Sequence, residues 1–137
     1  MDEVKNTRRS KVRLSYDGKV FKEFKGCQAE ERFNNEVLVL KYLEEKGCPF
    51  VPRIIYTDQS KLLIVTTNCG KLVEHISDRK KEALFAELEG FGVRHEDAYA
   101  RNITYRVTDG RFCIIDFEFA TVLDNPNHKS PQPFQPK

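Results

Sequence analysis

The sequence of 137 residues lacks long hydrophobic runs, closely spaced cysteine pairs, internal repeats and any large excess of charge of one sign. No segment has the length and apolar character of a membrane span or a signal peptide, so we expect a soluble, cytoplasmic protein with no membrane partner. The net charge of +2 is too small to favour binding to nucleic acid. These absences leave a single intracellular domain that is large enough to bury a core.

The four cysteines, at positions 27, 48, 69 and 113, do not have the spacing of a zinc-binding pair. They lie in or beside apolar segments. We therefore expect reduced thiols that are buried as small hydrophobic side chains.

A hairpin is predicted near the end of the chain. Two apolar and β-branched runs flank Asp109-Gly110, a dipeptide typical of a two-residue type I′ loop. With this loop, Ile103 would lie opposite Asp116, and Asn102 and Asp116 would become neighbours at the open end of the hairpin.

Three polar side chains would then meet at this point, because Asp97 lies one short loop upstream. Asp116 ends an apolar strand, and burying a carboxylate without a partner is costly, which favours a cation there. Phosphoryl transfer uses such a set: one carboxylate orients the attacking hydroxyl, and a carboxylate and an amide hold Mg²⁺. Each residue taken singly is equally typical of a solvated turn, so the prediction depends on their combination.

A lysine and a glutamate upstream extend this set. Asp17-Gly18 predicts another hairpin, and Lys22 in its second strand shares a face with apolar neighbours. A helix predicted over residues 30–45 places Glu36 inside its apolar stripe, where Lys22 is the natural cation to meet it. The alternatives are that Lys22 reaches to solvent and that Glu36 lies at the wet edge of the stripe.

The middle of the chain contains further regular structure. Strands are predicted over residues 53–57 and 62–66, and a helix over residues 78–89. Ser77 or Asp78 is expected to cap this helix, and Gly90 to close it.

These motifs resemble the protein-kinase-like superfamily. His95-x-Asp97 with Asn102 is similar to its H-x-D-x-x-x-x-N catalytic loop, and Asp-Phe-Glu at 116–118 stands where the superfamily has D-F-G or D-[FW]-[ED]. The second form is closest in style to aminoglycoside phosphotransferases, choline kinases and lipopolysaccharide sugar kinases. The resemblance implies that Asp97 is the catalytic base and that Asn102 and Asp116 bind Mg²⁺.

The resemblance also implies the nucleotide contacts. Lys22, held by Glu36, would contact the phosphates of ATP, and the strand ending at residue 66 would lead into a hinge where Thr67 and Asn68 meet the adenine. For this Asn-Cys-Gly segment the alternative is an ordinary turn.

The implied fold is α+β, a minimal bilobal protein-kinase-like fold with a truncated C-terminal lobe. Residues 1–68 would form an N-lobe-like sheet with one helix. Residues 69–124 would form the truncated lobe with the catalytic hairpin, and residues 125–137 a Pro-rich, extended tail.

The sequence departs from the family pattern in several places. It is much shorter than a full kinase domain and has no recognisable activation loop, and Glu96 replaces the arginine that would receive an activation-loop phosphate. There is also no Gly-rich loop, and the segment 6–10 stands in its place. Arg8 or Arg9 would clamp phosphates there, or else simply add surface charge.

The sequence therefore predicts a kinase, which transfers the γ-phosphoryl group of Mg²⁺-ATP to a hydroxyl acceptor on a protein or a small molecule. A non-catalytic, nucleotide-binding pseudokinase is the first alternative. The second is a protein-interaction module that uses the Pro-rich tail or the basic N-terminus. A chain this short would find its acceptor site on a protein partner or across a homodimer.

Overall fold

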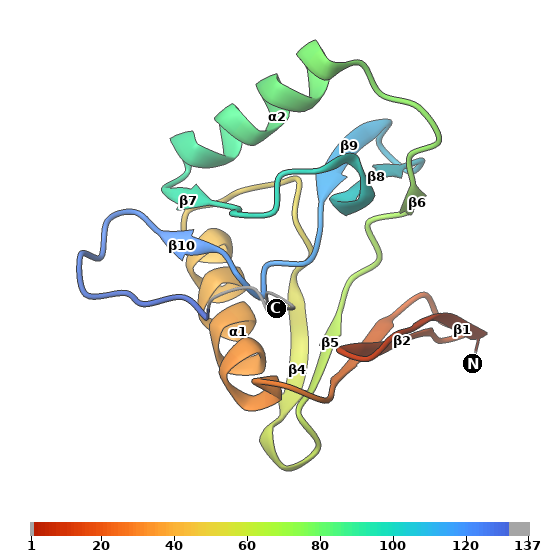
Figure 1. The fold of residues 1–137 in the computed structure, drawn as a ribbon. Coiled ribbons are helices and arrows are strands. Elements are labelled where there is room, and N and C mark those ends of the chain that lie inside the picture. Colours follow the sequence, from red (N-terminus) through yellow and green to blue (C-terminus); the bar gives the residue numbers. More distant parts are fainter. Residues whose placement is uncertain (1, 132–137) are drawn as a thin grey trace.

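The computed structural model describes residues 2–131, and the fold is α+β. Its largest unit is a five-stranded antiparallel sheet in the order β1-β2-β3-β5-β4. The strands are β1 (Asp2–Asn6), β2 (Ser10–Leu14), β3 (Val20–Phe24), β4 (Ile54–Asp58) and β5 (Leu63–Thr66). Helix α1 (Ala29–Glu45) packs against β3, β4 and β5 (Figure 1).

The second part of the chain contains one helix and two small antiparallel sheets. One sheet has the order β6-β8-β9, and the other pairs β10 with β7. Helix α2 lies above the β8–β9 hairpin in the view of Figure 1. The elements are β6 (Lys71–Leu72), α2 (Asp78–Gly90), β7 (Val93–Arg94), β8 (Ile103–Arg106), β9 (Arg111–Ile114) and β10 (Thr121–Val122), with short 3₁₀ turns at Gln59–Lys61 and Ala100–Asn102.

Both predicted helices are confirmed. Helix α1 buries a stripe that includes Phe33, Leu40 and Leu43. After the helix the chain changes direction at Gly47, whose φ is 75°. Helix α2 begins after Ser77, whose side chain accepts a hydrogen bond from the N–H of Lys80 at 3.1 Å. The strands predicted over residues 53–57 and 62–66 are also present: β4 is shifted by one residue toward the C-terminus, and β5 begins one residue later than predicted.

The predicted register of the second hairpin was wrong. Ile103 pairs with Ile114 and not with Asp116, so the loop has four residues, 107–110. A type I′ turn needs positive φ at both central residues, and in this loop only Gly110 has it, at 63°. Instead, the Asp109 carboxylate accepts hydrogen bonds from the guanidinium of Arg106 at 2.8 and 2.7 Å, which stabilises the longer loop.

The corrected register differs from the predicted one by two residues, so each side chain stays on its expected face. Asn102 now lies opposite Ile115, whose N–H donates to the Asn102 carbonyl at 2.9 Å. Asn102 and Asp116 are therefore still brought to the same end of the hairpin.

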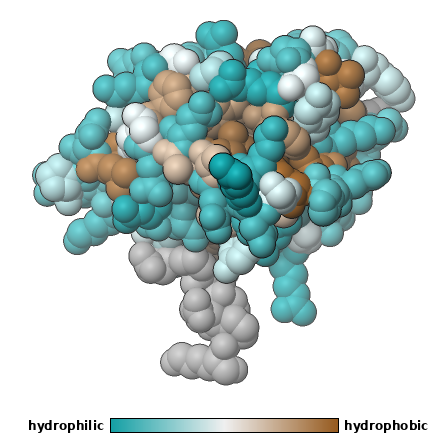
Figure 2. Space-filling view, turned by 90° about the horizontal axis from the view of Figure 1, so that it is seen from above, coloured by the Kyte–Doolittle hydropathy of each residue, from teal (hydrophilic) through white to brown (hydrophobic). Residues whose placement is uncertain are grey.

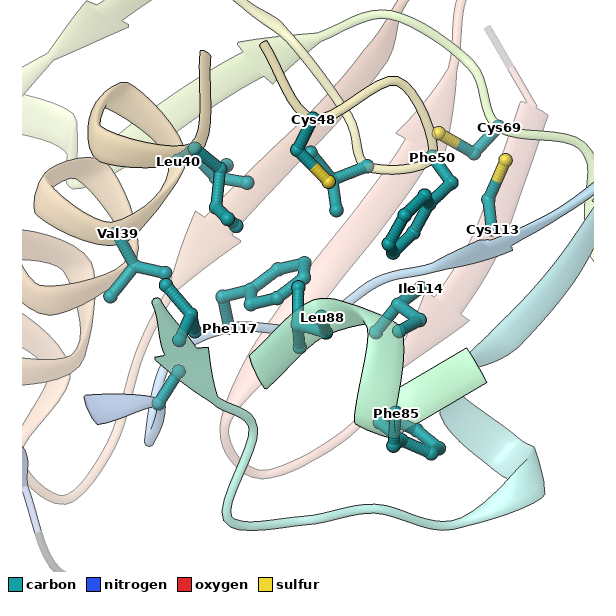
Figure 3. Packing of buried hydrophobic residues seen from close by; sticks show 14 of the residues in the cluster. Val39, Leu40, Cys48, Phe50, Cys69, Phe85, Leu88, Cys113, Ile114 and Phe117 are labelled. Carbon is teal, nitrogen blue, oxygen red and sulfur yellow. The ribbon is translucent and has the colours of Figure 1, made fainter. Parts of the chain in front are cut away.

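A single hydrophobic cluster joins α1 to the second part of the chain (Figure 3). Its fully buried members come from α1, the connection after it, α2, β7, the β8–β9 hairpin and the segment after β9, and include Leu40, Phe50, Leu88, Ile114 and Phe117. Because these side chains share one core, helix α1 is packed together with the hairpin region.

The cysteines agree with the prediction at three of four positions. Cys48, Cys69 and Cys113 are buried in the core, and all four thiols are free. Cys27 is exposed, contrary to the prediction, because it lies in the loop between β3 and α1.

Gly70 marks a close approach between two segments. Its φ is 92°, and a Cβ atom at this position would lie 1.9 Å from the carbonyl oxygen of Tyr105. Only glycine fits the connection between β5 and β6 at this point.

Within residues 2–131, no helix is long and apolar enough to cross a membrane. The face shown in Figure 2 is mostly hydrophilic, with hydrophobic residues in separate patches. Of the predicted tail, residues 132–137 lie outside the described part of the chain. Its beginning is tied to α1, because Nε2 of His128 donates to Oδ1 of Asn35 at 2.6 Å.

Candidate functional site

Lys22, in the middle of β3, lies at the centre of the candidate site. Its Nζ is 2.9 Å from Oε1 of Glu36 in α1, 2.9 Å from Oδ1 of Asp116 and 3.3 Å from Oε2 of Glu118. The Lys22 side chain is only 8% exposed. The predicted contact between Lys22 and Glu36 is present, and three distant segments meet at one ammonium group.

The electrostatics of this cluster follow from burial and from the carboxylates around a single lysine. Burial alone would lower the pKa of Lys22, but Asp116, Glu36 and Glu118 together raise it well above its ordinary value. Burial raises the pKa of Glu36 to about 7, although Lys22 opposes this shift. For Asp116 the effect of burial is outweighed by Lys22 and Lys5, which lower its pKa to about 2. Lys22 is thus a cation and Asp116 an anion at neutral pH.

Asp116 follows β9 in a left-handed backbone conformation, with φ at 63°. Non-glycine residues rarely adopt this conformation, and such positions cluster at functional sites. Both backbone groups of the preceding residue, Ile115, are hydrogen-bonded. Its N–H donates to the carbonyl of Asn102, and its carbonyl is 2.9 Å from Nε2 of His95. The Asp116 side chain is 25% exposed, so one side of the carboxylate remains open to solvent.

Asp97 and Asn102 form a second pair of functional groups. Nδ2 of Asn102 donates to Oδ2 of Asp97 at 2.9 Å and to the Asp97 carbonyl at 2.8 Å. Oδ1 of Asp97 accepts a hydrogen bond of 2.6 Å from the exposed Arg101. Both carboxylate oxygens of Asp97 are therefore fixed in direction by donors in its own loop.

His95 supports this loop from inside. The ring packs edge-on between Phe85 and Phe117, and it is only 3% exposed. Nδ1 accepts a hydrogen bond from the N–H of Asp97, so Nε2 carries the proton and donates it to the carbonyl of Ile115. One buried imidazole therefore connects the residue before Asp116 with the backbone of Asp97. Burial lowers its pKa.

Glu118 is a member of the cluster that the sequence reasoning did not single out. Besides Lys22, it has Arg9 and Arg32 within 3.7 Å of Oε1. Arg32 is almost fully buried and also donates to the carbonyls of residues 9, 25 and 27. A sequence signal for Glu118 did exist, since this charged residue lies between Phe117 and Phe119 in an otherwise apolar segment.

Thr67 and Asn68 do not join the Lys22 cluster. Oγ1 of Thr67 accepts a hydrogen bond from the N–H of Arg53, and Oδ1 of Asn68 accepts one from the N–H of Gly70. Both residues line a hollow of about 490 Å³, together with Arg53 and Arg106 among others. The Thr67 side chain thus bonds to the segment before β4, and the Asn68 side chain bonds within its own turn.

Two hollows at the surface are lined by residues outside the cluster. The first is the hollow next to Thr67, and the second, of about 390 Å³, is lined by residues of α2 and of the segment 94–99. Neither is lined by Lys22, Glu36 or Asp116.

Asp116 and Asn102 supply the types of oxygen that a magnesium ion accepts as ligands. Between residues 2 and 131 no three acidic, histidine or cysteine side chains converge to hold a metal ion by themselves. Asp116 supplies an ionised and partly exposed carboxylate. Within residues 2–131, no group donates a hydrogen bond to Oδ1 of Asn102. Mg²⁺ is often bound by one or two protein oxygens and completed by water and substrate phosphates.

No protein-family model matches this chain, and no curated protein sequence matches it significantly. The interpretation of the site therefore depends on its residues and their geometry.

Proposed function

We propose that this protein is a kinase that transfers the γ-phosphoryl group of ATP to a hydroxyl acceptor and needs Mg²⁺. The observation that carries the proposal is the position of Lys22 between Glu36 and Asp116, at 2.9 Å from each. Retaining a buried lysine between two carboxylates costs desolvation free energy, and apolar residues would fill the same space at lower cost. A site that binds phosphates explains why the charges are there.

In this proposal each residue has a distinct role. Lys22, kept in place by Glu36, binds the phosphates of the nucleotide. Asp116 and Asn102 hold the Mg²⁺, which neutralises charge on the phosphates when it is bound. Asp97 orients the acceptor hydroxyl and accepts its proton, and the bonds from Arg101 and Asn102 fix the direction of its carboxylate.

The proposed architecture is a minimal version of the kinase-like fold. The five-stranded sheet with α1 would correspond to the N-terminal lobe, and α2 with the β8–β9 hairpin to a truncated C-terminal lobe. The hinge role of Thr67 and Asn68 would then rest on backbone groups, since their side chains already accept hydrogen bonds from the N–H groups of Arg53 and Gly70.

A second candidate function is a nucleotide-binding pseudokinase. The specific observation in its favour is that both oxygens of Asp97 already accept hydrogen bonds. An acceptor hydroxyl would have to share one of these oxygens or displace Arg101. Binding and turnover therefore need separate measurements.

Calorimetric titration of the protein with ATP, with and without Mg²⁺, tests the binding site. We expect Mg²⁺-dependent binding in the wild type and its loss in Asp116→Ala. Asp78→Ala serves as the control, because it removes an aspartate at the start of α2 that is 91% exposed and takes no part in the ion pairs around Lys22. If the wild type does not bind ATP at millimolar concentration, both the kinase and the pseudokinase are excluded.

Formation of ADP separates the two candidates. A kinase that binds ATP in water releases ADP slowly even without its acceptor, because water takes the place of the hydroxyl. ATP binding with no ADP formation above the background of Asp97→Asn would favour the pseudokinase.

A further inference from the structure

The first strand contains an irregularity that re-aims one lysine. In the β1–β2 pairing, Glu3 lies opposite Arg13, whereas Lys5 lies opposite Val12, so the register shifts at Val4. Without this bulge Lys5 would lie opposite Lys11, on the other face of the sheet. β-bulges often re-aim a side chain next to an active site.

The shift places two lysines on the same face. Val12 pairs with Lys5 on one side and with Lys22 on the other, and directly paired residues point to the same face of a sheet. The two ammonium groups meet the same carboxylate: Lys22 Nζ lies 2.9 Å from Oδ1 of Asp116, and Lys5 Nζ lies 3.8 Å from Oδ2. Asp116 is thus bracketed by a buried and an exposed lysine.

We propose that Lys5 is a second phosphate-binding residue, which contacts the polyphosphate of the nucleotide and replaces the missing Gly-rich loop. This inference rests on the proposed function, because it requires a nucleotide at Asp116. A lysine side chain supplies the charge and the hydrogen-bond donors that backbone N–H groups supply in a glycine loop.

The arginines of the β1–β2 turn are less suited to this role. Arg9 lies 3.7 Å from the buried carboxylate of Glu118, and its guanidinium stacks on Phe119 at 5.4 Å from the ring centroid. These contacts hold Arg9 against the segment after Asp116. Arg8 is exposed, and no ion pair links it to that segment within residues 2–131.

Lys5 is able to leave Asp116 without cost to the fold. Its side chain is 45% exposed, and an ion pair of 3.8 Å at the surface contributes little to stability. Phosphates held with Mg²⁺ at Asp116 would lie beside this carboxylate. Rotation of the flexible Lys5 side chain would then bring its ammonium group from the carboxylate to a phosphate oxygen.

Titrations of the full chain with ATP, ADP and adenosine in the presence of Mg²⁺ test this role. We expect Lys5→Ala to weaken the binding of ATP by about tenfold, the effect of one lost charge-assisted hydrogen bond. Adenosine binding should not change, and Lys5→Arg should restore most of the ATP affinity. Lys11→Ala is the matched control, because it removes a lysine with a 3.8 Å ion pair, to Glu3, on the neighbouring strand but on the other face.

The outcomes are distinct. Weaker ATP binding in Lys5→Ala together with wild-type affinity in Lys11→Ala supports the inference. Equal losses in the two variants would reduce the effect to overall charge, and an unchanged or higher ATP affinity in Lys5→Ala would make Lys5 only a counter-ion of Asp116; either result overturns it. In these cases the proposed function still stands if the wild type binds Mg²⁺-ATP and Asp116→Ala does not.

Discussion

The ammonium nitrogen of Lys22 and Oε1 of Glu36 lie 2.9 Å apart, and their side chains are only 8% and 6% exposed. The pair joins the middle of the five-stranded sheet to the middle of α1. Breaking a buried pair is costly because the remaining charge has no solvent around it. Lys22 has two further carboxylates nearby, whereas the charge of Glu36 is balanced by Lys22, so the loss of either partner should have a different effect on stability.

We expect Lys22→Met to destabilise the fold by about 3 kcal/mol and Glu36→Gln by about 1 kcal/mol. Lys22→Met leaves Glu36 without a cation, whereas Glu36→Gln leaves Lys22 with both Asp116 and Glu118. Urea unfolding of the two variants gives the comparison. A larger loss for Glu36→Gln than for Lys22→Met would contradict this description of the cluster.

Asp97→Asn should separate binding from chemistry. The amide cannot accept the proton of an acceptor hydroxyl, so ADP formation should fall by about 100-fold or more. The affinity for Mg²⁺-ATP should stay close to that of the wild type, since Asp97 is not among the proposed metal ligands. Asp78→Asn, which changes an exposed aspartate of α2, is the control for ADP formation. Equal rates in Asp97→Asn and the wild type would exclude Asp97 as the base.

His95 predicts a pH dependence of stability. Burial lowers the pKa of His95 in the folded protein, so the unfolded chain binds a proton at a higher pH than the folded one. The resulting stability is present above the ordinary pKa of about 6.5 and is lost as the pH falls, with a slope of at most about 1.4 kcal/mol per pH unit.

The measurement compares urea unfolding of the wild type and His95→Gln between pH 5 and pH 8, a range of about three units around the ordinary pKa of histidine. A glutamine amide can also donate to the carbonyl of Ile115, but it does not titrate. We expect the pH slope to decrease in His95→Gln and to persist in His75→Gln, which changes an exposed histidine. An equal slope in His95→Gln and the wild type would assign the dependence to other groups.

A comparison of alanine variants at Gly70 and Gly18 tests the path of the chain between β5 and β6. Both have a positive φ, of 92° and 83°, but only Gly70 has backbone within contact distance of an added Cβ. Gly18→Ala should cost about 1 kcal/mol, because alanine is strained in a left-handed conformation. Gly70→Ala should cost upward of about 3 kcal/mol, because the carbonyl of Tyr105 must also move. Thermal unfolding that shows equal losses would contradict the observed path of the chain.

Much of this structure could be predicted from local patterns. The apolar periodicity and the end signals are sufficient for both helices, and Ser77 was an expected cap that the structure contains. Glu36 was predictable as well, because a carboxylate in the middle of an apolar stripe requires a partner. The spacing of Asp97 and Asn102 was sufficient to bring the two side chains together, since they share one short loop.

Other features could not be predicted, because they depend on contacts between residues and not on a local sequence pattern. The hairpin register was set by the contact between Arg106 and Asp109, which competes with the turn preference of Asp-Gly. The position of Lys5 depends on a bulge at Val4, and no residue pattern in the strand marks it. The chemical class of the acceptor has no local signature at all.

The edge position of β1 has a consequence for the local stability of this strand. All five residues of β1 are exposed, and the strand is bonded to β2 alone, whereas α1 and the hairpin share a core that contains Leu40 and Phe117. Lifting β1 breaks ladder hydrogen bonds and the polar contacts of Glu3, Lys5 and Asn6, but no fully buried apolar side chain of β1 is exposed. Fraying of this strand should then be far more frequent than unfolding of the whole domain, and amide hydrogens of β1 should exchange far sooner than those of α1.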